Sequence, residues 1–358
     1  MEAAERALGR QVADAFAAEL SRHAPGRELL AKFPPPAGPP DMYVLKLTQN
    51  PNDPNQPGAL YDASGDRMVF NHWDIVRVLQ MKLPPERMKA IEGRAADVGL
   101  LSALFKEDPS LLRVLVDALD VNYFHELKHA EQARRGRLEI EQMRGNLPFA
   151  NPLSKEHEAY REECRYLVSK GGSALVDSPF AQRCLMMLKD PDAHRDWITN
   201  LYVSNYNGFG TVDDVASRQE VRREAARASG EGWAAWGRRK LREAGLARGD
   251  EALAAYRAAE LEREKAFLAA VPDLRRRGAE AVVAAHLSAG RYGEAFAAAK
   301  SLPHGTAEDH DKRLAGLADK AAAWIARDKA PGGRDARLNA AGAVGTYFNE
   351  TGRPWPPR

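Results

Sequence analysis

The sequence predicts a mostly helical α+β protein, and three observations support this fold class. The only good strand candidates fall between residues 42 and 71. From residue 74 onward, apolar residues recur at steps of three and four, which is the period of an amphipathic helix. After residue 210 the composition shifts to Ala, Arg and Glu, which favour helices. We therefore expect a small antiparallel sheet packed on helices, followed by an all-α C-terminal part.

The chain begins with a predicted helix over residues 2–23. Its apolar residues recur every four positions, at Leu8, Val12, Phe16 and Leu20. Residues 33–40 are rich in proline, which removes backbone donors and fixes φ, so this stretch reads as a stiff connector.

The strand candidates are residues 42–47, 59–62 and 67–71. The first is followed by residues 50–58, which are almost entirely Asn, Asp, Gln, Pro and Gly and indicate a turn. The second and third flank Ala63-Ser64-Gly65-Asp66, a pattern typical of a β-hairpin.

A long helix is predicted to start after Asp108, with Pro109 in its first turn, and to end near Gly136. A break near Asp120 or Asn122 is possible within it. A second helix is expected to start at Asn151-Pro152 and to end at Gly171-Gly172. The apolar stripe of the long helix consists of Leu112, Val116, Leu119, Tyr123, Leu127 and Ala130.

These elements suggest three regions. Residues 1–210 form a first domain, residues 211–330 an all-helical C-terminal domain, and residues 331–358 a loosely ordered tail. Residues 279–302 are typical of a helical hairpin of the tetratricopeptide sort, but a single such unit is not a repeat array.

Composition excludes several functional classes. The 52 basic and 50 acidic residues nearly cancel, so no global charge recruits nucleic acid or an anionic membrane. Cys164 and Cys184 are too few for a disulfide framework or a structural all-cysteine zinc site. We expect two buried reduced thiols, with a single bridge between them as the alternative. Neither a signal peptide nor a membrane span is visible, which favours a cytoplasmic protein, although export by a non-classical route stays open. The oligomeric state is not indicated.

The segment most informative about chemistry is His125-Glu126-Leu127-Lys128-His129. Four-residue spacing places His125 and His129 on one helix face, where two imidazole nitrogens can reach one Zn²⁺ ion. Glu126 lies about 100° further round the helix, beside the metal, where a general base can reach a water. The competing interpretation is a solvated helix with two ordinary histidines. The apolar stripe on the same helix argues against it.

This motif resembles that of the zincin superfamily of metallopeptidases, and the resemblance extends loosely from about residue 59 to about residue 170. No Gly-x-x-His follows the motif, so the resemblance is to gluzincin-like members, in which a downstream glutamate is the third ligand. Glu156 and Glu158 are the candidates. Glu156 shares a face with mostly inward-facing types, whereas Glu158 shares one with solvated residues, which favours Glu156. The alternative that both are surface carboxylates stays open.

The resemblance implies a zinc-dependent peptidase acting on a protein or peptide substrate, with Glu126 as general base. Tyr160 and His157 are candidates for stabilising the transition state. An edge strand, best assigned to residues 67–71, would pair with an extended substrate. Gln132 or Asp120 could support a ligand histidine from behind.

Two rival interpretations remain at this point. In one, the chain is a non-catalytic zincin-like binding or regulatory protein whose helical C-terminal region recruits a partner. A fourth protein ligand, such as His157, would then close the zinc site. In the other, the chain is a toxin-like effector peptidase delivered by a dedicated secretion machine.

Overall fold

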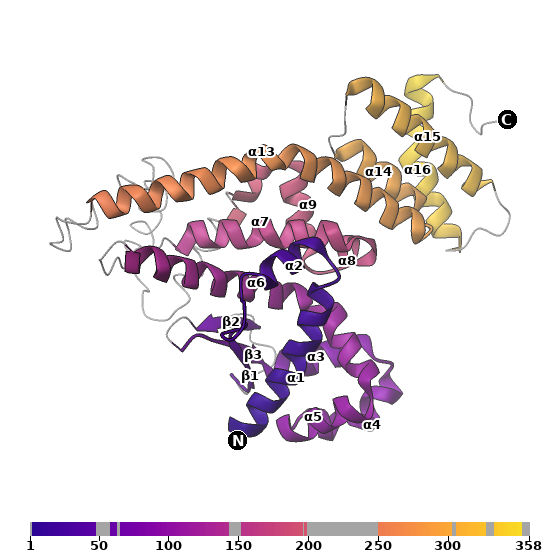
Figure 1. Ribbon diagram of the computed structural model, residues 1–358. Helices are drawn as coiled ribbons and strands as arrows, with labels where there is room; N and C mark the ends of the chain where they lie inside the picture. Colours follow the sequence, from indigo (N-terminus) through magenta and orange to yellow (C-terminus); the bar gives the residue numbers. More distant parts are fainter. Residues whose placement is uncertain are drawn as a thin grey trace, which may run out of the picture. The chain divides into compact units, whose positions relative to one another are not determined.

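The structure is a computed structural model that describes residues 2–47, 58–62, 65–142, 152–195, 197–198, 250–302, 306–326 and 333–352. Helices dominate this part of the chain (Figure 1). The strands are β1 Asp41–Leu45, β2 Ala59–Asp62 and β3 Arg67–Asn71. The first helices are α1 Glu2–Leu20, α2 Ala24–Leu30, α3 His72–Lys82, α4 Pro85–Ala95 and α5 Val98–Glu107. Those that follow are α6 Pro109–Gln142, α7 Pro152–Lys170, α8 Gly172–Val176, α9 Ala181–Lys189, α13 Asp250–Ser288, α14 Tyr292–Ser301, α15 Ala307–Ile325 and α16 Gly333–Thr351.

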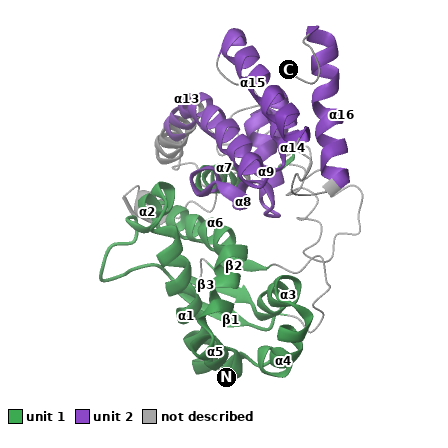
Figure 2. Cartoon of the chain, turned by 90° about the vertical axis from the view of Figure 1, so that its right-hand side faces the viewer, with its two compact units in different colours: residues 1–166, 196–261 green, residues 167–195, 262–358 purple. Residues whose placement is uncertain are grey.

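The chain divides into two compact units, which Figure 2 colours separately. Unit 1 consists of Met1–Tyr166 and Asp196–Leu261, and unit 2 of Leu167–Arg195 and Glu262–Arg358. The domain boundary predicted at residues 210–211 lies outside the described residues.

The sheet is mixed, with the strand order β1-β3-β2. The predicted hairpin is confirmed, because β2 pairs antiparallel with β3. The prediction of a wholly antiparallel sheet is wrong, since β1 pairs parallel with β3. β3 (residues 67–71) was also predicted to be an edge strand, but it is the central one. The sequence predicts where the strands lie along the chain but not their order in the sheet. That order depends on where the chain returns to the sheet after β1.

Helix α1 covers β1, and its predicted apolar stripe is confirmed. Leu8, Val12, Phe16 and Leu20 are all fully buried. A methyl group added at Gly9 would overlap the carbonyl of Met42, so the helix backbone lies directly against the strand. This close approach requires glycine.

Helix α6 runs beside β2 and carries the core residues that hold the motif in place (Figure 1). It is one unbroken helix, so no break occurs near Asp120 or Asn122. The Tyr123 ring packs 5.2 Å from Phe16 and 6.5 Å from Phe70, and the Phe124 ring stacks on Tyr166 of α7 at 4.8 Å. The two residues directly before the motif therefore fix the helix by aromatic contacts, Tyr123 with Phe16 and Phe70 and Phe124 with Tyr166.

Unit 2 has a core of its own, built by α13 to α16. The predicted helical hairpin is present, with Gly290 in the left-handed region (φ 70°) at its turn. The prediction of a loosely ordered tail over residues 331–358 is wrong for α16, where Val344 and Phe348 are buried. Because glycines and prolines flank this segment, the four-residue spacing of its apolar side chains was not recognised as the pattern of a helix.

Two smaller predictions have clear outcomes. Both cysteines are buried as expected, but neither is a free thiol, so the prediction of reduced thiols is wrong. Cysteine pairing depends on tertiary position, which a spacing of twenty residues does not reveal. Within the described residues, no helix combines the length and the apolar character needed to cross a bilayer.

Candidate metal centre

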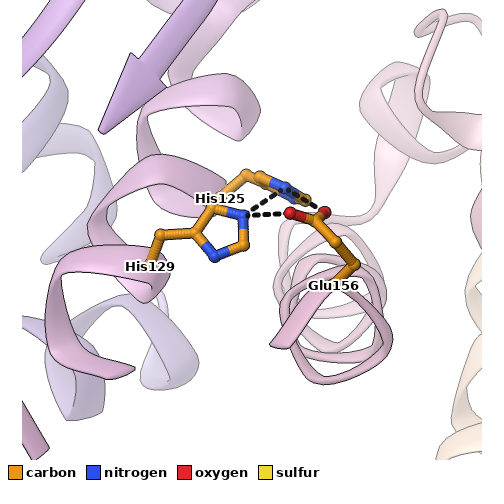
Figure 3. A group of neighbouring side chains, drawn as sticks. All are labelled: His125, His129 and Glu156. Atoms are coloured by element: carbon orange, nitrogen blue, oxygen red, sulfur yellow. Dashed lines mark hydrogen bonds and ion pairs between the residues drawn. The ribbon is translucent and has the colours of Figure 1, made fainter. Parts of the chain in front are cut away.

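The structure brings His125, His129 and Glu156 together into one group (Figure 3). The two imidazoles come from successive turns of α6, and the carboxylate reaches them from the first turns of α7. All three side chains are only 10–16% exposed. The four-residue spacing and the buried stripe of α6 thus place both rings at the helix interface, as the sequence predicts.

The potential ligand atoms lie close enough for one ion. His129 Nε2 is 2.9 Å from Glu156 Oε1 and 3.1 Å from His125 Nε2. His125 Nε2 is 3.3 Å from Glu156 Oε2. Ligands at about 2.0–2.1 Å from a tetrahedral Zn²⁺ ion lie about 3.3 Å apart, so small outward shifts would accommodate the ion.

The far nitrogens of both rings have hydrogen-bonding partners. His125 Nδ1 is 3.1 Å from Glu163 Oε2, and His129 Nδ1 is 2.9 Å from Gln132 Oε1. A carboxylate and an amide oxygen can only accept, so each ring must place a proton on Nδ1. In the neutral form, each ring then directs an Nε2 lone pair into the group.

Two Nε2 lone pairs that face each other at 3.1 Å repel unless a proton or a cation lies between them. Burial lowers the pKa of His125, but the hydrogen bonds and negative charge of Glu156 and Glu163 outweigh it and raise the pKa to about 10. Burial opposes ionisation of Glu156, yet His129 and His125 hold the pKa of that carboxyl well below its usual range. The group therefore strongly attracts positive charge, which is the property a divalent-metal site requires.

Glu126 lies beside this group rather than in it. Burial raises its pKa, and the positive potential of His129 and His125 only partly offsets that rise. The backbone N–H of Tyr61 on β2 donates a hydrogen bond to this carboxylate. A carboxylate with a raised pKa next to a cation-attracting group is suited to accept and return a proton.

The remaining predicted site residues occupy different places. Glu158 accepts bonds from Lys128 Nζ at 2.9 Å and Arg135 Nη2 at 2.8 Å, and it does not join the histidines. The Tyr160 ring packs edge-on against His125, with a centroid distance of 4.7 Å. His157 is half-buried and is not a member of the metal-ligand group found within the described residues.

The supporting residues were only partly foreseen. Gln132 does support His129, but Asp120 accepts the hydroxyl of Tyr166 instead of an imidazole N–H. The acceptor next to the far nitrogen of His125 is Glu163, and not Asp120 as suggested. The signal for Glu163 was its seven-residue separation from Glu156, which is two helical turns and hence the same face of α7.

No family model, curated protein or solved structure matches this chain. The geometry of the site is therefore the basis for proposing a function.

Proposed function

We propose that this chain is a zinc-dependent peptidase of the gluzincin-like type, with His125, His129 and Glu156 as metal ligands and Glu126 as general base. The observation that carries this proposal is the convergence of two Nε2 lone pairs and one carboxylate, all within 3.3 Å of one another. A structural zinc site is normally closed by four protein ligands, whereas a catalytic one keeps a position for water. Among the residues that the structure describes, the group has three members, which favours the catalytic kind.

Bound zinc would polarise a scissile carbonyl and lower the pKa of a water molecule. With zinc bound, Glu126 would be placed to accept a proton from the attacking water and to return it to the leaving amine nitrogen. Its raised pKa suits both transfers, because a weakly acidic carboxyl group holds the proton between them. Tyr160 and His157 are retained as candidates for contact with the transition state.

An extended substrate segment fits the outer edge of β2. Asn71 N donates to Gly58 O at 2.9 Å, so hydrogen-bonded pairs with β3 alternate from Gly58 onward. The backbone groups of Ala59 and Tyr61 consequently point away from β3. Since the N–H of Tyr61 reaches Glu126, this outer edge faces the proposed catalytic base. A peptide added to the edge would carry its backbone past Glu126.

Hydrogen bonds at the turn between β2 and β3 hold β2 in position. The Tyr61 hydroxyl donates to Asp66 Oδ1 at 2.6 Å, and Arg134 of α6 donates to Asp66 Oδ2 at 3.2 Å. Asp66 itself has φ 47°, in the left-handed region. These bonds tie the hairpin turn to α6 one to two helical turns beyond His129, and support the proposed alignment of edge and metal group.

The test is metal analysis combined with a cleavage assay on the full chain. We expect about one zinc per chain, lost in His125→Ala and His129→Ala, with Glu156→Gln as a milder variant that keeps the shape of the side chain. His157→Ala is the matched control and should retain the metal. Cleavage of a denatured-protein or peptide library, read by mass spectrometry, should stop with a chelator and return with zinc.

Three results would overturn the proposal. One is a wild-type protein that takes up no zinc from a zinc-containing buffer. Another is loss of zinc in His157→Ala, which would indicate a closed structural site. The last is a zinc-loaded protein that cleaves no substrate in the library, as the non-catalytic binding interpretation expects.

A further inference from the structure

The side chain of Gln132 joins the metal group to a buried cluster of ion pairs. This cluster consists of Lys128, Glu131 and Arg135 on α6 and Glu158 on α7, and we refer to it as the charge cluster. Its bonds are Lys128–Glu131 at 2.7 Å, Lys128–Glu158 at 2.9 Å, Arg135–Glu131 at 3.1 Å and Arg135–Glu158 at 2.8 Å. All four side chains are between 11 and 23% exposed.

The surroundings of Gln132 determine which end of its amide faces which way. Gln132 is 2% exposed, and its Nε2 donates to Lys155 O and to Glu158 Oε2, both at 2.9 Å. Both partners can only accept, so the amide nitrogen must face them. A flipped amide would set its oxygen against a carbonyl and a carboxylate, leaving two buried contacts between acceptors.

The amide oxygen is therefore directed at His129, 2.9 Å from Nδ1. The imidazole must then donate from Nδ1, so that Nε2, 2.9 Å from Glu156 Oε1, is the ring nitrogen that faces the group and can bind a cation held there by the carboxylate. With the other tautomer, an Nε2–H bond would point into the group and block a cation. The Glu158 carboxylate is held in position by Lys128 and Arg135, and it is the one member of the charge cluster that accepts a hydrogen bond from the Gln132 amide.

We propose that Gln132 is a positioning residue that locks His129 in its Nδ1–H tautomer, with Lys155 O and Glu158 fixing the orientation of its amide. This inference rests on the proposed metal site but concerns a different residue and a different measurement. Replacing a residue that hydrogen-bonds the far nitrogen of a metal-binding histidine typically weakens metal affinity by about 10- to 100-fold.

The first readout is the protonation state of the His129 ring in the metal-free full chain, from long-range ¹H–¹⁵N spectra assigned with a His129→Gln variant. We expect a proton on Nδ1 in the wild type. In Gln132→Met, which keeps the length of the side chain but removes the acceptor, we expect the ring to change to the Nε2–H tautomer, which donates to Glu156 instead.

The second readout is the dissociation constant for Co²⁺, from its visible absorption, and for Zn²⁺ by competition. Gln132→Met should weaken binding by about 10- to 100-fold. Circular dichroism checks that Gln132→Met is folded. Glu131→Gln is the matched control, because it alters the charge cluster without touching the Gln132 amide, and it should leave tautomer and affinity unchanged.

The inference is overturned if Gln132→Met keeps the Nδ1–H tautomer, or if Glu131→Gln weakens metal binding as much as Gln132→Met does. The latter result would mean that the charge of the cluster, and not the hydrogen bond between His129 and Gln132, determines metal affinity. These failures differ from failure of the proposed function. A chain that binds no metal at all would still show whether Gln132 fixes the ring, because the tautomer is measured without metal.

Discussion

Glu126 and Glu156 are carboxylates on neighbouring helices whose environments push their pKa values in opposite directions. Burial raises the pKa of Glu126, while His129 and His125 lower that of Glu156. In the proposed function, this difference suits Glu126 to carry a proton and Glu156 to stay charged as a ligand. The sequence identifies both glutamates as candidates. The proposed role of each follows from whether it contacts the imidazoles.

This separation predicts the behaviour of Glu126→Gln. The amide keeps the shape of the side chain but cannot take a proton, so turnover should fall by about 10²- to 10⁴-fold. Zinc content should stay at the wild-type value, because the three ligands are untouched. Parallel metal analysis and peptide-cleavage rates check this, with Glu131→Gln as the control carboxylate on the same helix. Activity within a few-fold of the wild type would remove Glu126 from the proposed role.

Among the elements, the packing of α1 on β1 depends most clearly on a single position. Gly9 lies in the middle of the helix, and any side chain there would meet the backbone of Met42. The sequence predicted this helix and its apolar face correctly. It did not predict that the helix would lie on a strand, because close backbone contact leaves no periodic signal in the residues.

We therefore expect Gly9→Ala to lower the free energy of unfolding by about 1–3 kcal/mol, through overpacking. Gly93→Ala is the control, since nothing lies within 4 Å of the position its Cβ would take on α4. There, removing a helical glycine should stabilise the chain by about 0.5–1 kcal/mol. Urea titrations of both variants measure the difference. Equal effects would contradict the close contact between α1 and β1.

At the scale of the whole molecule, His72 links folding to pH. It is fully buried at the start of α3, and burial, together with the charge of Lys46, lowers its pKa to about 4. In the unfolded chain a histidine titrates near pH 6.5. Below that value the unfolded chain takes up a proton that the folded one refuses, so stability is full above about pH 6.5 and is lost as the pH falls towards 4.

A shift of this size corresponds to at most about 3 kcal/mol between pH 7 and pH 4. Replacing His72 by Leu should remove that part of the pH dependence, so the unfolding free energy of the variant should fall less than that of the wild type as the pH is lowered. Urea denaturation at pH 7, 5.5 and 4.5 tests this. Parallel curves for the two proteins would show that His72 is not the group responsible.

The sequence by itself determined the mostly helical class, the hairpin, the apolar stripes of α1 and α6, and the shared face of His125 and His129. Each of these follows from the backbone period of a single segment, which residue spacing records directly. Tertiary structure decided the parallel pairing of β1 and the folding of α16. It also decided that Glu156 contacts the histidines, whereas Glu158 contacts Lys128 and Arg135. These features depend on contacts between segments far apart in the chain, and such contacts leave no period in the sequence.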